Sequence, residues 1–300
     1  MPASGRVVAI GDLHGDLDAL RATLRLAGAI DSDDRWIGKD LTVVQTGDQV
    51  DRGDRDREVL DVIEKLEVDA KAAGGAFHVL IGNHELMNAN FDFRYVSRKS
   101  FVGFADLGRL AAGAAERVPD EQRGRAAAFA PGGTYARKLA LHKAVALVGD
   151  SLFAHGGVLP AHVDYGLDRL NREASDFLNG KLRGLPAALS AEDSPVWTRF
   201  YGAEMVDDSC QVLERVLGEV GAKRLIVGHT VQAGGINGAC RGRVFRIDVG
   251  LSAYYGVRPA QVLEITSQGT RILTAASPTD SNAEGSKKSQ PSTPALHSQP

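Results

Sequence analysis

The chain has 300 residues, of which 43% are hydrophobic, and its formal net charge is −3 at pH 7. This length fits one large domain or two small ones, with enough apolar residues for a sizeable core. The near-neutral charge excludes general nucleic-acid binding through a basic face. No run reaches the roughly 20 apolar residues that a membrane helix needs, so we expect no membrane partner.

The cysteines and the N-terminus indicate an intracellular protein. Cys210 and Cys240 lack metal-ligand spacing, and we expect both to be reduced packing residues. The first apolar run reaches Asp12 too soon to be a secretory signal. We therefore expect a cytoplasmic location.

The first 80 residues predict an alternation of strands and helices. The expected strands lie at 6–10, 41–46 and 77–81. Asp16 can cap the helix after the first strand, and Gly28 can end it. Apolar residues from Val59 to Leu66 mark a second helix that stops near Gly74. This order and spacing favour a layered α/β fold with neighbouring parallel strands.

The remainder of the chain predicts an insertion and further strands. Residues 86–140 are rich in Ala, Arg and Gly, and we interpret them as a helical insertion with one helix near 101–117. Gly149 and Asp150 separate two apolar runs, which predicts a hairpin. Further helices are expected at 167–180 and 209–220, and strands at 224–227, 244–249, 261–265 and 271–274.

These elements predict one domain over residues 1–276. From residue 277 to 300, Ser, Pro, Asn and Lys dominate and hydrophobic periodicity disappears. Such a composition cannot bury enough apolar area to offset the entropy of ordering, so we expect a disordered C-terminal tail.

Five predicted strands end in a glycine beside Asp, Asn or His. Together these endings and their loops carry six oxygen or nitrogen donors: Asp12, His14, Asp48, Asn83, His155 and His229. Open α/β sheets place ligands just beyond the carboxyl ends of their strands. One such ending is weak support for a site, but five are strong. We expect one sheet to bring all six donors to one spot.

The donor set contains no thiolate, and it therefore suits manganese, iron or zinc, with magnesium as an alternative. Asp48 can bridge two cations because a carboxylate has two oxygens. Two cations about 3.5–4 Å apart can hold a hydroxide and a phosphoryl oxygen together, and they lower the pKa of water. The expected cofactor is a pair of divalent or trivalent metal ions, with manganese preferred over iron or zinc.

Three further side chains are candidates for the reaction. His84 follows the proposed ligand Asn83 and can protonate a leaving alkoxide as general acid. Asp51 can hold the His84 imidazole in the correct tautomer. Arg52 can grip a phosphate bidentately.

Each candidate also has an ordinary structural alternative. A lone histidine is more often a hydrogen-bonded structural residue, Arg52 can be a surface ion pair, and Asn83 can be a turn residue. These alternatives weaken together because the six donors all lie at strand exits. Three other histidines do not share that placement, and we interpret them as structural: His78 in a strand, His142 in a helix-like run and His297 in the tail. The pattern around His162 favours a structural role without deciding it.

At residues 11–157 the sequence resembles the phosphoprotein phosphatase branch of the calcineurin-like metallophosphoesterases. The motifs are Gly-Asp-x-His-Gly, Gly-Asp-x-Val-Asp-Arg-Gly, Gly-Asn-His-Glu and His-Gly-Gly, and Gly-His-Thr at His229 extends the match. The resemblance implies a four-layer α/β fold with a central β-sandwich flanked by α-helices, and a dinuclear metal centre. It assigns the six donors as metal ligands, His84 as acid, Asp51 as its partner and Arg52 as phosphate binder.

Finer features look like the bacterial-type Shewanella-like phosphatases. They are the stretches Glu85–Asn88, Phe91–Ser97 and Ser194–Arg199. This resemblance implies that Arg199 is a second phosphate-binding arginine. Residues 248–255 replace the Ser-Ala-Pro-Asn-Tyr loop of the eukaryotic serine/threonine phosphatases. The branch is associated with phosphotyrosine as well as phosphoserine and phosphothreonine, which leaves the substrate open.

Three hypotheses follow. The leading one is a metal-dependent phosphomonoesterase that acts on phosphoproteins at Ser/Thr, Tyr or both. The second is a hydrolase of dinucleoside polyphosphates or another small phosphate ester; Asp51 and Glu85 favour the first. The third is a metal-free interaction scaffold. Such a protein loses ligands or the catalytic histidine, and this sequence retains all of them.

Overall fold

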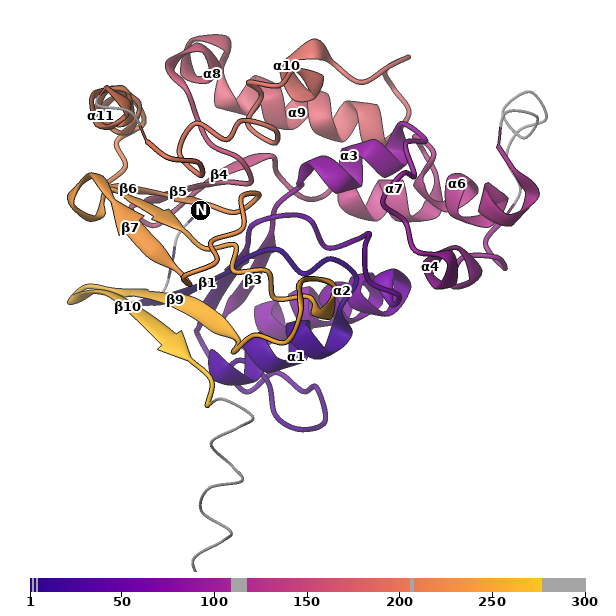
Figure 1. The fold of residues 1–300 in the computed structure, drawn as a ribbon, viewed down its shortest axis with the longest axis horizontal. Helices are drawn as coiled ribbons and strands as arrows, with labels where there is room; N and C mark the ends of the chain where they lie inside the picture. Colours follow the sequence, from indigo (N-terminus) through magenta and orange to yellow (C-terminus); the bar gives the residue numbers. More distant parts are fainter. Residues whose placement is uncertain (2, 4, 109–117, 206–207, 277–300) are drawn as a thin grey trace, which may run out of the picture.

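The computed structural model describes residues 1, 3, 5–108, 118–205 and 208–276. The predicted tail, residues 277–300, therefore lies outside the described residues, and so do residues 109–117 of the helix expected at 101–117. Figure 1 shows two central sheets with helices outside them and a group of short helices to one side.

The first sheet has the strand order β10-β9-β1-β2-β3. Its strands are β1 (Arg6–Ile10), β2 (Thr42–Gln45), β3 (Ala76–Val79), β9 (Gln261–Thr266) and β10 (Gly269–Thr274). The first three strands are parallel neighbours, as expected, and β9 pairs antiparallel with β1. The carboxyl ends of β1, β2 and β3 therefore share one edge.

The second sheet has the order β4-β5-β6-β8-β7. Its strands are β4 (Val145–Val148), β5 (Ser151–Ala154), β6 (Arg224–Val227), β7 (Asn237–Ala239) and β8 (Val244–Arg246). The predicted hairpin joins β4 to β5, and Gly149 takes a left-handed conformation with φ of 58° in its turn. The three-residue strand β7 was not predicted.

The two sheets pack face to face as a sandwich. Phe153 of β5 and Ile226 of β6 share one buried cluster with residues of β1 and β2, whereas their neighbours Leu152 and Leu225 point to the other face. This alternation follows from the two-residue period of a strand. The interior of the sandwich is therefore continuous between the sheets.

Helices cover both outer faces (Figure 1). α1 (Leu17–Leu26) and α2 (Asp56–Ala72) pack against the first sheet, and Asp16 caps α1 by accepting from the Asp18 and Ala19 amides. On the second sheet lie α8 (Pro160–Tyr165), α9 (Leu167–Leu178) and α11 (Ser209–Val220), with the short α10 (Ala187–Ser190) beside α9. The four-layer α/β sandwich implied by the resemblance is confirmed.

The insertion expected over 86–140 is helical. Its described helices are α3 (Asn83–Ala89), α4 (Arg98–Val102), η1 (Asp120–Gln122), α6 (Arg123–Phe129) and α7 (Thr134–Leu139). The prediction of a helix beginning near 101 is wrong, because α4 ends at Val102 and a turn follows. Phe104, Phe129 and Tyr135 form a compact aromatic core here, with ring centroids 5.2–5.9 Å apart.

Cys210 and Cys240 form a disulfide, so the expectation of two reduced cysteines is wrong. The two cysteines are 30 residues apart in the sequence, and they meet because the start of α11 lies beside the turn between β7 and β8. This contact cannot be recognised from the sequence. Structural disulfides persist in oxidising compartments, so the expected cytoplasmic location loses this support and stays a prediction.

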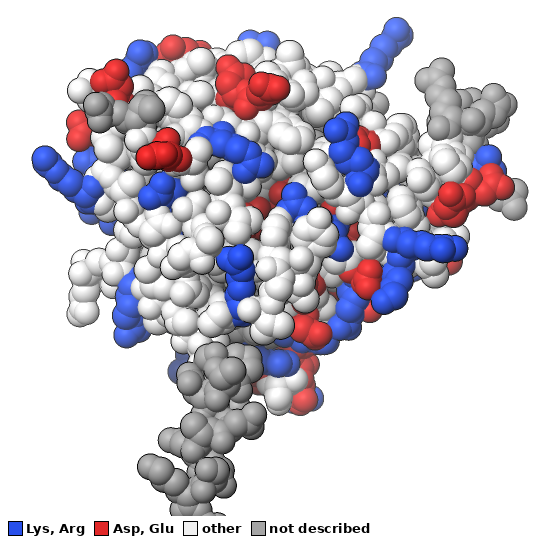
Figure 2. Space-filling model, in the orientation of Figure 1, with Lys and Arg blue, Asp and Glu red and all other residues white. Residues whose placement is uncertain are grey.

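Among the described residues, no helix combines the length and the apolar character needed to cross a bilayer. On the face drawn in Figure 2, acidic and basic side chains are interspersed.

Candidate active site

All six predicted donors follow the carboxyl ends of parallel strands, five of them in loops and Asn83 as the first residue of a helix. Asp12 and His14 follow β1, Asp48 follows β2, and Asn83 begins the helix after β3. His155 and His229 follow β5 and β6. The expectation that one sheet supplies the donors is wrong, because the sandwich brings the carboxyl ends of both sheets to one place. Every donor residue is at most 7% exposed.

The carboxylate of Asp48 lies at the centre of this cluster. Its Oδ2 atom is 3.8 Å from His14 Nε2, 3.7 Å from His84 Nε2 and 3.2 Å from His155 Nε2. His155 Nε2 is also 2.9 Å from Asn83 Oδ1 and 3.1 Å from His229 Nδ1. Two groups of potential ligand atoms therefore share one carboxylate.

The histidines of the donor set turn their unprotonated ring nitrogens toward the centre. The ring nitrogens that point away from it face backbone carbonyls: His14 Nδ1 faces Val50 O (3.2 Å), His155 Nδ1 faces Thr46 O (2.9 Å) and His229 Nε2 faces Trp197 O (3.0 Å). A carbonyl can only accept, so each outward nitrogen carries the proton. Burial lowers the pKa of His14 to about 3 and that of His229 to about 2, which keeps both rings neutral.

Buried carboxylates crowd the same region. Burial raises the pKa of Asp12 well above its usual range, and the charges of Asp248 and Asp48 add to the effect. Burial likewise raises the pKa of Asp248 to about 6. Sequence reasoning missed Asp248, whose backbone lies against Gly11 beside the first donor loop. Carboxylates, neutral imidazoles and an amide oxygen around one buried space fit a pair of hard or borderline metal ions.

The backbone is constrained around these donors. Of the ten non-glycine residues with positive φ in the described part of the chain, five belong to the predicted site: His14 (47°), Asp48 (55°), Asp51 (73°), Arg52 (67°) and His229 (65°). Left-handed conformations are costly for residues with a Cβ and concentrate at functional sites. Gly82 is required for close approach, since a Cβ there would collide with the Asp48 carboxylate.

His84 differs from the other histidines in its partner. Its Nδ1 lies 2.6 Å from Asp51 Oδ2, whereas the others use carbonyls. Distance alone would admit His84 as a ligand, because its Nε2 also faces Asp48. Burial lowers the pKa of His84, but the Asp48 charge and the Asp51 hydrogen bond outweigh burial and the net pKa is raised. A protonated His84 can donate from Nε2 into the site.

Two arginines flank the donors. Arg52 Nη1 lies 2.7 Å from His14 Nε2, and the Arg52 guanidinium is 5.2–5.8 Å from the ring centroids of Tyr95, Tyr254 and Tyr255. The exposed Arg199 donates from Nη1 to His229 O (2.8 Å) and Thr230 Oγ1 (3.0 Å). The structure thus brings both predicted arginines to the rim of the site.

The other histidines that the structure describes lie away from the site. His78 is in β3, and His162 accepts a hydrogen bond from the Leu159 amide at the start of α8. His142 lies in a turn after α7, 3.2 Å from a Glu67 oxygen, and not in a helix as predicted. His297 is outside the described residues.

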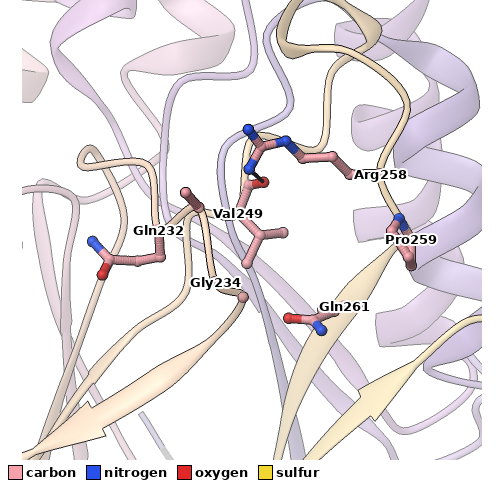
Figure 3. Close-up of a pocket in the computed structure, with 8 residues that line it drawn as sticks. Gln232, Gly234, Val249, Arg258, Pro259 and Gln261 are labelled. Carbon is pink, nitrogen blue, oxygen red and sulfur yellow. Dashed lines mark hydrogen bonds between the residues drawn. The ribbon is translucent and has the colours of Figure 1, made fainter.

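A separate pocket of about 200 Å³ lies between the loop after β6 and the segment that leads into β9 (Figure 3). Gln232, Val249, Arg258 and Gln261 line it, and none of the predicted site residues does. Arg258 donates to Val249 O across 3.4 Å. Gln232 connects the pocket to the neighbourhood of the site, because its N donates to Asp248 O and its Nε2 donates to Thr230 O.

Glu85 is a buried residue that connects two loops of the site, a structural role that the sequence did not predict. Its carboxylate accepts four backbone N–H groups, from Asp48 (2.9 Å), Gln49 (2.8 Å), Val50 (3.3 Å) and Gly82 (2.7 Å). It therefore fixes the loop after β2 against the loop after β3. Burial, with the nearby Asp48 charge, raises the pKa of Glu85 to about 7.

Replacing Glu85 with glutamine should lower the free energy of unfolding by about 3 kcal/mol, because the amide NH₂ cannot accept and leaves buried N–H groups unpaired. Denaturant unfolding of the metal-free protein measures this loss. Glu219→Gln, which breaks an exposed pair with Arg215 on α11, is the matched control and should cost well under 1 kcal/mol. A Glu85→Gln protein as stable as this control would contradict the organising role.

Comparisons with known proteins were made against families, curated proteins and solved structures. Residues 5–233 match the calcineurin-like phosphoesterase family. The chain is 42% identical to Shewanella-like protein phosphatase 2 of Arabidopsis thaliana, covering 90% of this chain and 78% of that one. It is 26% identical to Shewanella-like protein phosphatase 1 of Plasmodium berghei, covering 84% and 68%.

Among solved structures, a cold-active protein tyrosine phosphatase superposes with a TM-score of 0.75 at 26% identity, covering 90% of this chain and 76% of that one. The motifs, the sandwich and the convergent donors agree with these matches. The chain thus belongs to the calcineurin-like phosphoesterase family, and it is a phosphoesterase of the Shewanella-like phosphatase type.

Proposed function

We propose that this phosphoesterase is a protein phosphatase that removes phosphate from Ser/Thr, Tyr or both, with two metal ions. The names of the relatives support the protein substrate: two are called protein phosphatases, and the structural neighbour is a protein tyrosine phosphatase. The observation that carries the dinuclear proposal is the shared Asp48 carboxylate between two groups of ligand atoms.

The donors divide between two positions. Asp12 and His14 would hold one metal, and Asn83, His155 and His229 would hold the other, with Asp48 between them. Bound metals would lower the pKa of water and stabilise charge on the phosphoryl oxygens. Oxygen and imidazole ligands favour manganese, with iron or zinc as alternatives.

The other residues act on the substrate. Arg52 and Arg199 would bind phosphoryl oxygens from the rim and orient the phosphate. His84 would donate its Nε2 proton to the oxygen that leaves with the substrate side chain. Asp51 accepts the Nδ1–H bond, which fixes the tautomer and stabilises the charged ring before the proton leaves.

A metal-reconstituted screen tests this function. The purified chain, loaded separately with Mn²⁺, Zn²⁺ or Fe²⁺, should bind two metals per chain by elemental analysis and hydrolyse phosphotyrosine and phosphoserine peptides. Diadenosine tetraphosphate serves as the competing substrate. Faster hydrolysis of this dinucleotide than of either peptide would favour the small-ester alternative. A metal content below one per chain after loading would contradict the dinuclear proposal.

A further inference from the structure

Arg125 of α6 is the largest fully buried side chain in the described part of the chain, at 0% exposure. Each of its guanidinium nitrogens has a polar partner. Nε donates to Asn88 Oδ1 (2.7 Å), Nη1 to Ser100 Oγ (2.8 Å), and Nη2 to Asp51 Oδ1 (2.9 Å) and Asp56 Oδ2 (2.7 Å). The rings of Phe104 and Phe129 lie 5.1 and 4.9 Å from its Cζ atom.

These contacts fix the carboxylate of Asp51. Oδ1 accepts from Arg125 Nη2 and from Asn88 Nδ2 (2.9 Å), while Oδ2 faces His84 Nδ1. The Asp51 backbone amide donates to Asp56 Oδ2, the same oxygen that pairs with Arg125. Both carboxylate oxygens and the backbone amide of Asp51 therefore have defined hydrogen-bond partners. One of these partners, Arg125, lies 74 residues away in the insertion.

We propose that Arg125 is a positioning residue for the acid: it holds Asp51 in the one orientation that keeps the His84 Nε2 proton aimed into the site. The inference rests on the proposed role of His84. It gives the helical insertion a function in the reaction, because α6 supplies a contact that the sandwich itself lacks.

Stability alone does not account for this arginine. The insertion already has an apolar core built on Phe104, Phe129 and Tyr135. A buried ion pair contributes little net stability compared with well-packed apolar residues, since two charges must be desolvated. A planar guanidinium, in contrast, fixes several acceptors in one geometry, which a lysine ammonium cannot do.

The test compares two monoesters with leaving groups of different quality, phenyl phosphate and p-nitrophenyl phosphate. Arg125→Lys keeps the positive charge beside Asp51 and Asp56 but removes the planar guanidinium that donates to several acceptors at once. We expect kcat on phenyl phosphate to fall about 10-fold or more relative to kcat on p-nitrophenyl phosphate, in the range typical for outer partners of a functional histidine. Arg224→Lys, at the partly buried pair with Asp150, is the matched control and should leave the ratio unchanged.

A double variant identifies the route of the effect. In a His84→Ala background, Arg125→Lys should add no further change to the ratio. A second readout is the downfield proton of the His84–Asp51 hydrogen bond in the NMR spectrum of the zinc-loaded protein, assigned by its loss in His84→Ala. This signal should shift or broaden in Arg125→Lys and persist in Arg224→Lys.

The outcomes separate the two proposals. If His84→Ala changes the substrate ratio and Arg125→Lys changes neither the ratio nor the proton signal, the positioning role is overturned and the acid stands. Equal losses on both substrates in His84→Ala overturn the acid, and the positioning role with it. If Arg125→Lys does not fold, Ser100→Ala is tested in its place, because this change removes one hydrogen-bond partner of the Arg125 guanidinium without changing charge. Ser100→Ala should change the ratio of the two kcat values in the same direction. An unchanged ratio would overturn the positioning role of Arg125.

Discussion

His84→Ala is expected to slow hydrolysis of a phosphoserine peptide by about 10²- to 10⁴-fold, the usual contribution of general acid catalysis. A serine alkoxide needs a proton as it leaves, whereas p-nitrophenolate does not. The loss on p-nitrophenyl phosphate should therefore be much smaller. Single-turnover rates on the two substrates, with metal content measured in the same samples, give this comparison.

His155→Ala is the matched control for that experiment. It also removes a buried imidazole near Asp48, but one whose outward nitrogen faces a carbonyl. It should empty a metal position and damage both substrates alike. Equal losses in His84→Ala with both metals retained would show that His84 does not supply the leaving-group proton, and loss of metal would make it a ligand.

Asp48→Asn is expected to have the largest effect among the single changes at the donors. Its Oδ2 faces imidazole nitrogens of both ligand groups, so the change removes negative charge from both positions. We expect metal content below one per chain and a fall in kcat/KM of about 10³-fold or more, since metal ions contribute several kcal/mol to transition-state stabilisation.

The control for Asp48→Asn is Asp150→Asn, which removes a half-exposed carboxylate paired with Arg224 and Lys223. It should retain both metals and full activity. His155→Ala, at a single position, should retain more metal than Asp48→Asn. Two metals bound with normal affinity in Asp48→Asn would show that this carboxylate does not bridge them.

The sequence was sufficient to predict that these six side chains lie at strand ends, because the signals for this placement are local. A glycine and an acid directly after a buried strand, as at Gly47 and Asp48, already imply a sheet edge that carries ligands. Five such endings predicted the convergence that the structure shows. The number of sheets that contribute could not be read in this way, since the pairing of β5 with β6 is a long-range property of the fold.

Arg125 and the disulfide were missed for the same physical reason. Arg125 stands in an Ala- and Arg-rich stretch, and nothing in its neighbours distinguishes it from a solvated helix residue. Its burial depends on Asp51 and Asp56, which are distant in the chain. Cys210 and Cys240 form a disulfide because the turn after β7 lies beside the start of α11. Contacts that join separate elements leave no local pattern.

The order of strands in the first sheet has a consequence for synthesis on the ribosome. β1 lies in the middle of that sheet, and its partner on one side, β9, is made more than 250 residues later. A nascent chain therefore exposes one edge of β1 until β9 emerges. His229, which follows β6 of the second sheet, is also synthesised long after Asp12 and Asp48. The proposed metal site includes His229, so its set of donors cannot be complete on the emerging chain before β6 and the loop after it have been made.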